Sequence, residues 1–276
     1  MSKQRDAERR LEELLENATK EAAFRPEFYQ RLMEADVYVI NGDDSRPPRG
    51  DVEMKEGETV NLVQFPREDG TTALPFFTSL EILQKSIDHQ VNYICLPARV
   101  LFEMTEGTPL VLNPFSEFGK DFTPEEVRGL LSGEIPGGHA EKKTIEKDTN
   151  ILLGQPKHYP SKLVESLTTL FAADPAIKKA YLAQMYNPSE PDVKPHLVIG
   201  LQVEPPTGFE ASLKKIGPVA NASLPEGDVV DFILIGPDAK SGSGVAGYLL
   251  NETKPFYEAR WSDGINMFAD RKGVKN

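Results

Sequence analysis

The sequence predicts a mixed α/β protein of the α+β kind that is built from two domains. Segments whose apolar residues recur at three- and four-residue steps alternate with short runs rich in β-branched and aromatic residues, which indicates amphipathic helices among strands. The chain has 276 residues, 39% of them hydrophobic, which is enough for two ordinary domains with their own cores. Residues 134–148, rich in glycine and mixed charge, leave little to bury and predict a linker between the domains.

Residues 1–24 are expected to form a helix ahead of the first domain. Their apolar side chains recur at helical spacing with glutamate and arginine between them, so one face of the helix can pack on a core. The apolar residues are Ala7, Leu11, Leu14, Leu15, Ala18 and Ala22. A second, short helix is expected to begin near Pro26, with Phe28 and Leu32 on one side.

The N-terminal domain, residues 25–133, is expected to contain a mixed sheet with helices between its strands. The strand candidates, in chain order, are VYVI, TVNLVQF, ALPFF, YICL and PLVL. Capping boxes, in which a threonine caps the backbone and a glutamate three residues later reaches back, mark two helix starts. They lie at Thr78–Glu81 and Thr123–Glu126. Between them, the segment PARVLFEM predicts a short helix opened by proline.

The C-terminal domain, residues 149–260, shows its patterns in the order strand, helix, strand, strand, helix, strand. The segments are NILLGQP, PSKLVESLTTLFAA, KKAYLAQMY, HLVIGLQVE, a helix opened by a third capping box at Thr207–Glu210, and DVVDFILIG. This βαββαβ order is typical of the ferredoxin-like, or split βαβ, arrangement, and predicts a four-stranded antiparallel sheet with helices on one face. An extra C-terminal helix, VAGYLLNE, and a tail over residues 261–276 complete the chain.

Charge and the length of the apolar runs exclude several classes of protein. The formal net charge is −12 and the lysines and arginines gather only in pairs, so neither nucleic acid nor an anionic membrane is expected as a partner. No apolar run approaches the length of about eighteen residues that a membrane span needs. The N-terminus carries charges of both signs and lacks the apolar region of a secretory signal. A single cysteine allows no internal disulfide, so we expect a cytoplasmic protein.

Cysteine and histidine show no catalytic or metal-binding pattern, and we expect a non-catalytic protein without a cofactor. Cys95 is expected to be a buried structural cysteine, because Leu96 and Pro97 are poor at turning backbone N–H groups onto an oxyanion. The alternative is a thiolate nucleophile activated by a nearby helix start. The histidines are widely spaced, whereas zinc ligands usually come as local pairs. They are His89, His139, His158 and His196.

The glycine-rich stretch Gly236–Gly247 follows a strand and precedes a helix, which is where a phosphate-binding loop would lie. Its near match to G-x-G-x-x-G lacks the following strand and the distant acid of a dinucleotide-binding fold. Lys240 precedes the paired glycines instead of following them, so the P-loop pattern also fails. We therefore expect a flexible loop, with an anion site as the alternative.

Three phenylalanines occur within eight residues of turn-like sequence between the PLVL strand and the capping box that follows. They are Phe115, Phe118 and Phe122. Phe122 precedes the N-cap residue and Val127 stands at the N4 position, so a hydrophobic staple is expected, with the other two rings packed beneath the helix. The alternative is a patch that faces a protein partner, where exposed aromatic rings are typical.

The same stretch, LVLNPFSEFGKDFTPEEV, resembles the N-terminal domain of the enhanced serine sensitivity protein SseB family. Upstream, LPFFTSLEIL and LPARVLFEM are similar to that domain as well. In the second half, YPSKLVESLTTLF, DPAIKKAYLAQMY, FILI and KPFYEAR resemble the C-terminal domain of the family. The resemblance spans most of residues 25–260 and implies a bacterial, cytoplasmic protein. It carries over no catalytic residues, because the shared motifs consist of structural residues.

The residues and the resemblance leave three functional hypotheses open. The first is a non-catalytic protein that acts through protein contacts and affects serine tolerance indirectly, with Phe115 and Phe118 as candidate contact residues. The second is an acidic immunity or inhibitor protein that blocks a basic toxin or enzyme, suggested by the net charge and by Asp43 and Asp44 in the polar segment 41–58. The third is a small-molecule sensor or enzyme of amino-acid metabolism, which rests on fold analogy alone.

Overall fold

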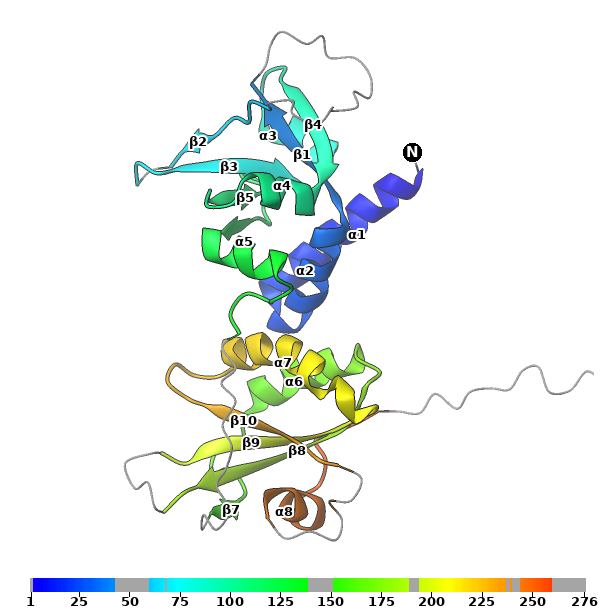
Figure 1. The fold of residues 1–276 in the computed structure, drawn as a ribbon, viewed down its shortest axis with the longest axis vertical. Coiled ribbons are helices and arrows are strands. Elements are labelled where there is room, and N and C mark those ends of the chain that lie inside the picture. The colour runs from blue at the N-terminus through cyan, green and yellow to red at the C-terminus, as the bar shows by residue number, and fades with distance from the viewer. Residues whose placement is uncertain are drawn as a thin grey trace, which may run out of the picture. The chain divides into compact units, whose positions relative to one another are not determined.

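The chain forms two compact units, each built on one mixed sheet (Figure 1). The computed structural model describes residues 2–42, 60–67, 69–138, 151–188, 194–236, 239 and 244–259. The units comprise residues 1–141 with 214–223, and residues 142–213 with 224–276. The predictions of two domains and of a mixed α/β class are confirmed. Beyond residue 138, the predicted linker 134–148 lies outside the described residues. In the described part of the chain, no helix is long and apolar enough to cross a membrane.

The first unit contains a six-stranded sheet in the order β4-β1-β3-β5-β6, with β2 also paired to β3. The strands are β1 Asp36–Asn41, β2 Phe65–Pro66, β3 Thr72–Phe77, β4 Asn92–Pro97, β5 Leu110–Leu112 and β6 Lys120–Phe122. The helices are α1 Ser2–Lys20, the 3₁₀ turn η1 Ala22–Phe24, α2 Arg25–Glu34, α3 Leu80–Ser86, α4 Ala98–Met104 and α5 Pro124–Leu131. Strands β3 and β5 are parallel and the other pairs are antiparallel. Strand β6 is an addition to the prediction, because it forms inside the stretch interpreted as an aromatic loop.

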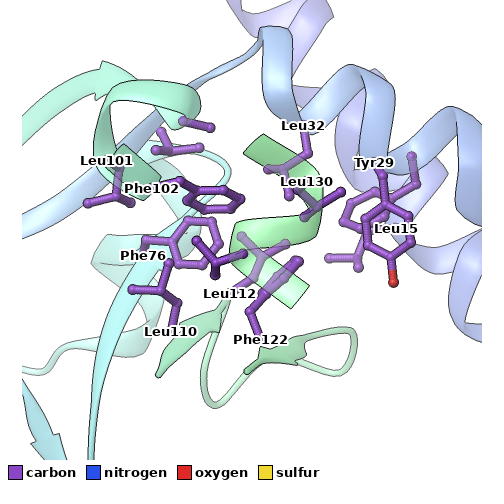
Figure 2. Packing of buried hydrophobic residues seen from close by; sticks show 14 of the residues in the cluster. Leu15, Tyr29, Leu32, Phe76, Leu101, Phe102, Leu110, Leu112, Phe122 and Leu130 are labelled. Atoms are coloured by element: carbon purple, nitrogen blue, oxygen red, sulfur yellow. The ribbon is translucent and has the colours of Figure 1, made fainter. Parts of the chain in front are cut away.

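The main core of the first unit lies where α1, α2, α4 and α5 meet the sheet. At its centre are three phenylalanines, Phe76, Phe102 and Phe122, whose ring centroids lie 5.8 Å from each other (Figure 2). The apolar side chains of α1 belong to the same cluster, so the stripe predicted for residues 1–24 packs on the core. Those side chains are Leu11, Leu14, Leu15 and Ala18. A smaller cluster joins α3 to the sheet through the buried side chain of Leu83.

The second unit contains a five-stranded sheet in the order β10-β9-β8-β11, with β7 also paired to β8. The strands are β7 Leu152–Gly154, β8 Ile177–Tyr186, β9 His196–Val203, β10 Val230–Leu234 and β11 Tyr257–Glu258. The helices are α6 Ser161–Ala172, the 3₁₀ turn η2 Pro206–Gly208 and α8 Val245–Glu252. Helix α7 Phe209–Ser223 begins in this unit, and its residues 214–223 belong to the first unit. The predicted element order is confirmed, and the short β11 is added.

The strand pairing in this sheet differs from the antiparallel, ferredoxin-like arrangement that the element order predicts. Strands β9 and β10 are direct parallel neighbours joined through α7, whereas a split βαβ unit has another strand between its parallel pair. Strand β7 pairs antiparallel with β8, the next strand in the sequence. The sheet is therefore mixed, because the parallel pair β9–β10 lies beside the antiparallel pairs that β8 makes with β7 and β9.

Helices also cover both faces of the second sheet, not one face as predicted. Figure 1 shows α6 on one side of the sheet and α8 on the other. A Cβ atom on Gly200 of β9 would lie 2.5 Å from Ile235 Cδ1 and 2.7 Å from Leu249 Cδ1 of α8. Only glycine at this position lets α8 approach so closely. Strand β8 is buried over most of its length, which requires cover on both faces.

The capping box predicted for α5 is confirmed, and the other two are corrected. Thr123 Oγ1 accepts from the backbone N–H of Glu126 (3.2 Å), and Glu126 Oε2 accepts from the N–H of Thr123 (3.0 Å). At α3 the N-cap is Ser79, one residue later than predicted, because the side chain of Thr78 is engaged elsewhere. Thr207 lies inside η2, and its hydroxyl makes no hydrogen bond to any residue that the structure describes.

Replacing Thr123 by alanine should lower the free energy of unfolding by about 1 kcal/mol, because alanine cannot accept the N–H of Glu126. Thr207→Ala is the matched control, since that exposed threonine caps nothing, and its change should stay within about 0.5 kcal/mol. Urea unfolding of the two variants measures both values. Equal losses would contradict the role of Thr123 as a cap.

Candidate functional site

The aromatic loop, residues 113–119 between β5 and β6, has a backbone held by side chains far away in the sequence. Asn113 begins the loop at φ 49°, in the left-handed region that asparagine tolerates better than most residues. It is 1% exposed. Its Oδ1 accepts from the backbone N–H of Thr78 (2.9 Å), and its Nδ2 donates to Thr78 Oγ1 (3.0 Å). This exchange ties the start of the loop to the end of β3.

Helices α1 and α3 also make hydrogen bonds near this junction between the loop and the end of β3. Glu12 of α1 accepts through Oε1 from the hydroxyls of Ser79 (2.7 Å) and Thr78 (3.1 Å). Ser86, at the end of α3, donates to the carbonyl of Pro114 (3.2 Å). The aromatic loop therefore has a fixed shape, set by α1, α3 and the end of β3.

The three phenylalanines of this stretch have three different environments. Phe122 is 1% exposed and shares the core with Val127, as the staple prediction requires. Phe118 is partly buried against that core, with the ammonium of Lys20 5.3 Å from its ring centroid. Phe115 is 80% exposed at φ 66°, so the prediction that it packs beneath α5 is wrong. Its one ring neighbour among the described residues is Phe65, at 6.3 Å between centroids.

The loop forms one wall of a groove of about 470 Å³, with α1 and α3 as the other walls. Its apolar lining comes from Leu15, Ile82, Phe115 and Phe118. Its charged lining comes from Arg9, Lys85, Glu12, Glu13, Glu16 and Glu117. Hereafter this groove, with Phe115 at its rim, is called the loop groove.

Most charges of the loop groove have a neighbour of opposite charge, but one carboxylate does not. Arg9 lies 3.8 Å from Glu13 and Lys20 pairs with Glu16. The ammonium of Lys85 donates to Glu81 (2.7 Å), which lowers the pKa of Glu81. Glu12 also acts on Lys85 and contributes to raising its pKa, whereas Glu117 has no basic group within ion-pair distance in the described part of the chain. The groove thus offers unmatched negative charge beside an exposed aromatic ring.

Two domain families together match most of the chain. The SseB protein N-terminal domain matches residues 11–129, and the SseB protein C-terminal domain matches residues 145–259. The chain belongs to the SseB family. It is similar to Protein SseB of Escherichia coli (strain K12) and to Protein SseB of Shigella flexneri, with 32% identity to each over 262 residues. The similarity covers 95% of this chain and 96% of each relative. No solved structure matches the chain.

The resemblance to the SseB family that the sequence motifs indicated is therefore confirmed. Apart from Arg9, the residues that line the loop groove lie within the part of the chain that matches the SseB N-terminal domain. Asp43 and Asp44, the other predicted contact residues, lie outside the described residues, so their part in a contact surface stays a prediction.

Cys95 in this SseB family member is exposed, so the prediction of a buried structural cysteine is wrong. Strand β4 lies at the sheet edge and alternates, with Ile94 and Leu96 packed on the core and Cys95 on the outer face. Cys95 is the register partner of Tyr38 in the neighbouring strand β1. The pKa of the Tyr38 phenol is raised, chiefly by burial and secondly by the hydrogen bond that its hydroxyl donates to Glu8. Because all four residues of YICL are apolar, the sequence does not show that alternate residues of this strand face the core and the outside.

The histidines do not converge in the described structure. His89 Nδ1 lies 2.8 Å from Asp88, and His158 is exposed, while His139 lies outside the described residues. His196 Nε2 lies 2.8 Å from Asp231 Oδ2, a pair the sequence did not predict because it depends on β9 and β10 being neighbours. Among the described residues there is no group of three or more His, Cys, Asp or Glu side chains that could hold a metal ion.

Most of the glycine-rich loop before α8 falls on residues 237, 238 and 240–243, which lie outside the described residues. Gly244 adopts φ 97°, a conformation that favours glycine, and α8 starts immediately after it. The flexible-loop prediction for this stretch therefore stays a prediction.

Proposed function

We propose that this member of the SseB family is a non-catalytic protein of the bacterial cytoplasm that acts by binding another protein through the loop groove. Its effect on serine tolerance, which the family resemblance implies, is indirect in this proposal. One observation carries it: Phe115 is held 80% exposed on a loop whose backbone is fixed by neighbouring elements.

An exposed phenylalanine with a positive φ is unfavourable in two ways. The left-handed backbone costs a residue with a Cβ atom about 1–2 kcal/mol. The exposed ring also forgoes the free energy of burial that the neighbouring Phe122 gains. Strained backbone positions that the surrounding structure enforces are concentrated at functional sites. A protein partner that covers Phe115 would supply the missing burial, and rigid aromatic anchors are typical of binding hot spots.

The charge of the loop groove indicates which kind of partner fits. Glu117 lacks a basic partner among the described residues, and the whole chain carries a net charge of −12. A partner segment in which a lysine or arginine lies next to an apolar side chain would complement both the negative charge of the groove and the Phe115 ring. Inhibition of a basic toxin or enzyme is the second candidate function, and the acidity of the same groove favours it. Association with such a partner should be fast and sensitive to salt.

Replacing Phe115 by serine should abolish capture of the partner without unfolding the protein. The test is affinity purification from native lysate, at low and high salt, with captured proteins identified by mass. Tyr159→Ser is the matched control, because Tyr159 is 58% exposed and lies in the second unit. At least one protein should be retained by the wild type and by Tyr159→Ser, lost from Phe115→Ser, and weakened by high salt.

Two outcomes would contradict this proposal. In the first, Phe115→Ser captures the same set of proteins as the wild type while its melting temperature is unchanged. In the second, capture is lost equally from Tyr159→Ser, which would place the contact away from the loop groove. Salt-insensitive capture would count against the basic character of the partner and against the inhibitor function.

A further inference from the structure

A second cavity of about 320 Å³ lies in the first unit next to the loop groove, since Leu15 lines both. It is bounded by α1, α2, α5, the start of β6 and residues 136–137. Its apolar lining includes Leu15, Ala18 and Phe28. Ligand cavities usually measure about 300–1,000 Å³, so this one suits a small molecule.

The cavity is lined by Tyr29, a buried phenol with an unused hydroxyl. Tyr29 is 5% exposed, and its ring packs between Phe28 and Phe122, with centroids 5.3 Å and 6.3 Å away. Its hydroxyl makes no hydrogen bond to any residue that the structure describes. Buried tyrosine hydroxyls usually have a partner, and an unsatisfied one calls for a water molecule or a ligand.

One cation of the cavity lacks a counter-charge. Lys120 Nζ donates to Glu126 Oε1 (2.9 Å) and to the carbonyl of Asp121 (3.0 Å), so its charge is matched. Arg25 donates only through Nε, to the carbonyl of Ala18 (3.3 Å), and its two terminal NH₂ groups have no partner within the described residues. Burial raises the pKa of Tyr29, and Glu126 and Arg25 also act on it, so the phenol lies within electrostatic reach of both.

We propose that this cavity binds a small monocarboxylate, whose oxygens accept hydrogen bonds from the Arg25 guanidinium and the Tyr29 hydroxyl. A carboxylate matches the planar fork of a guanidinium, which can donate to both of its oxygens. The single unmatched cation favours a monoanion over a phosphate dianion. The apolar side chains of the lining accommodate a short hydrocarbon part of the ligand. The site is separate from the Phe115 contact, and neither proposal depends on the other.

Titration of the ¹⁵N-labelled full chain with propionate, followed by NMR, tests the site. We expect saturable shifts at the end of α1, the start of α2 and residues 119–120, with a dissociation constant in the millimolar range. The neutral isostere propionamide should cause no such shifts, because it lacks the charge that Arg25 recognises. Arg25→Gln should weaken binding about tenfold or more, and Tyr29→Phe about three- to tenfold.

Arg31→Gln is the matched control, because Arg31 lies on the same helix but pairs with Glu34 on the surface, and its affinity for propionate should equal that of the wild type. Tyr29→Phe conserves the ring, so it keeps the test valid if Arg25→Gln fails to fold. The proposal is overturned if propionate and propionamide cause the same shifts, or if propionate causes none. It is equally overturned if inorganic phosphate binds more tightly than propionate, or if both Arg25→Gln and Tyr29→Phe bind like the wild type.

Discussion

Replacing Phe122 by alanine should lower the free energy of unfolding of the first unit by about 3–5 kcal/mol. The ring is 1% exposed and lies 5.8 Å, centroid to centroid, from both Phe76 and Phe102 (Figure 2). The ammonium of Lys120 lies 4.8 Å from its centroid and would lose that contact as well. Truncation therefore leaves a cavity beside Phe76 of β3 and Phe102 of α4.

Phe115→Ala is the matched control for this prediction, since it makes the same chemical change seven residues earlier in the chain. Because Phe115 is mostly exposed, its loss should change the free energy of unfolding by no more than about 0.5 kcal/mol. Urea unfolding measures both values, with amide exchange in β3 assigning the transition to the first unit. If the two variants are destabilised equally, the division of the phenylalanines into core and surface is wrong.

Replacing Asn113 by alanine should cost about 2–4 kcal/mol, although the residue is polar and lies in a loop. The change leaves the buried N–H of Thr78 without its acceptor, and it places a Cβ-bearing residue without a compensating side chain at φ 49°. The fixed shape of the aromatic loop depends on this side chain, so partner capture through Phe115 should fall with stability.

Asn113→Gly separates the two causes. Glycine adopts a positive φ freely but offers no acceptor to Thr78, so this variant should lose less stability than Asn113→Ala while still losing the hydrogen bonds. The same urea and exchange measurements compare the two variants. Equal losses below about 1 kcal/mol would show that the loop does not depend on Asn113.

The features that the sequence predicted well are those fixed by residues close together in the chain. The capping box of α5 needs only Thr123 and Glu126, three residues apart, and it forms as expected. The apolar stripe of α1 follows from helical spacing and packs on the core. The predicted cap at Thr78 failed because Asn113, 35 residues later, engages that side chain instead. Nothing in the local pattern carries that information.

The candidate site depends on such distant contacts. Phe115 and Phe122 lie in the same short stretch, yet one is exposed and the other buried, and their different environments arise from β6 and from the bonds of Asn113 and Ser86. The sequence marked the stretch as unusual through its three rings but missed the acidic side chains of α1. In the second unit, the parallel pairing of β9 and β10 could not be read from element order, although Gly200 within a strand was a signal of close packing.

The most direct test of the proposed binding role is the affinity of the captured partner for the wild type and for Phe115→Ser, measured by calorimetry. If Phe115 is the anchor of the loop groove, its replacement should weaken binding by at least about tenfold, which corresponds to about 1.4 kcal/mol. Equal affinities of the wild type and the folded variant would contradict a binding role for the loop groove.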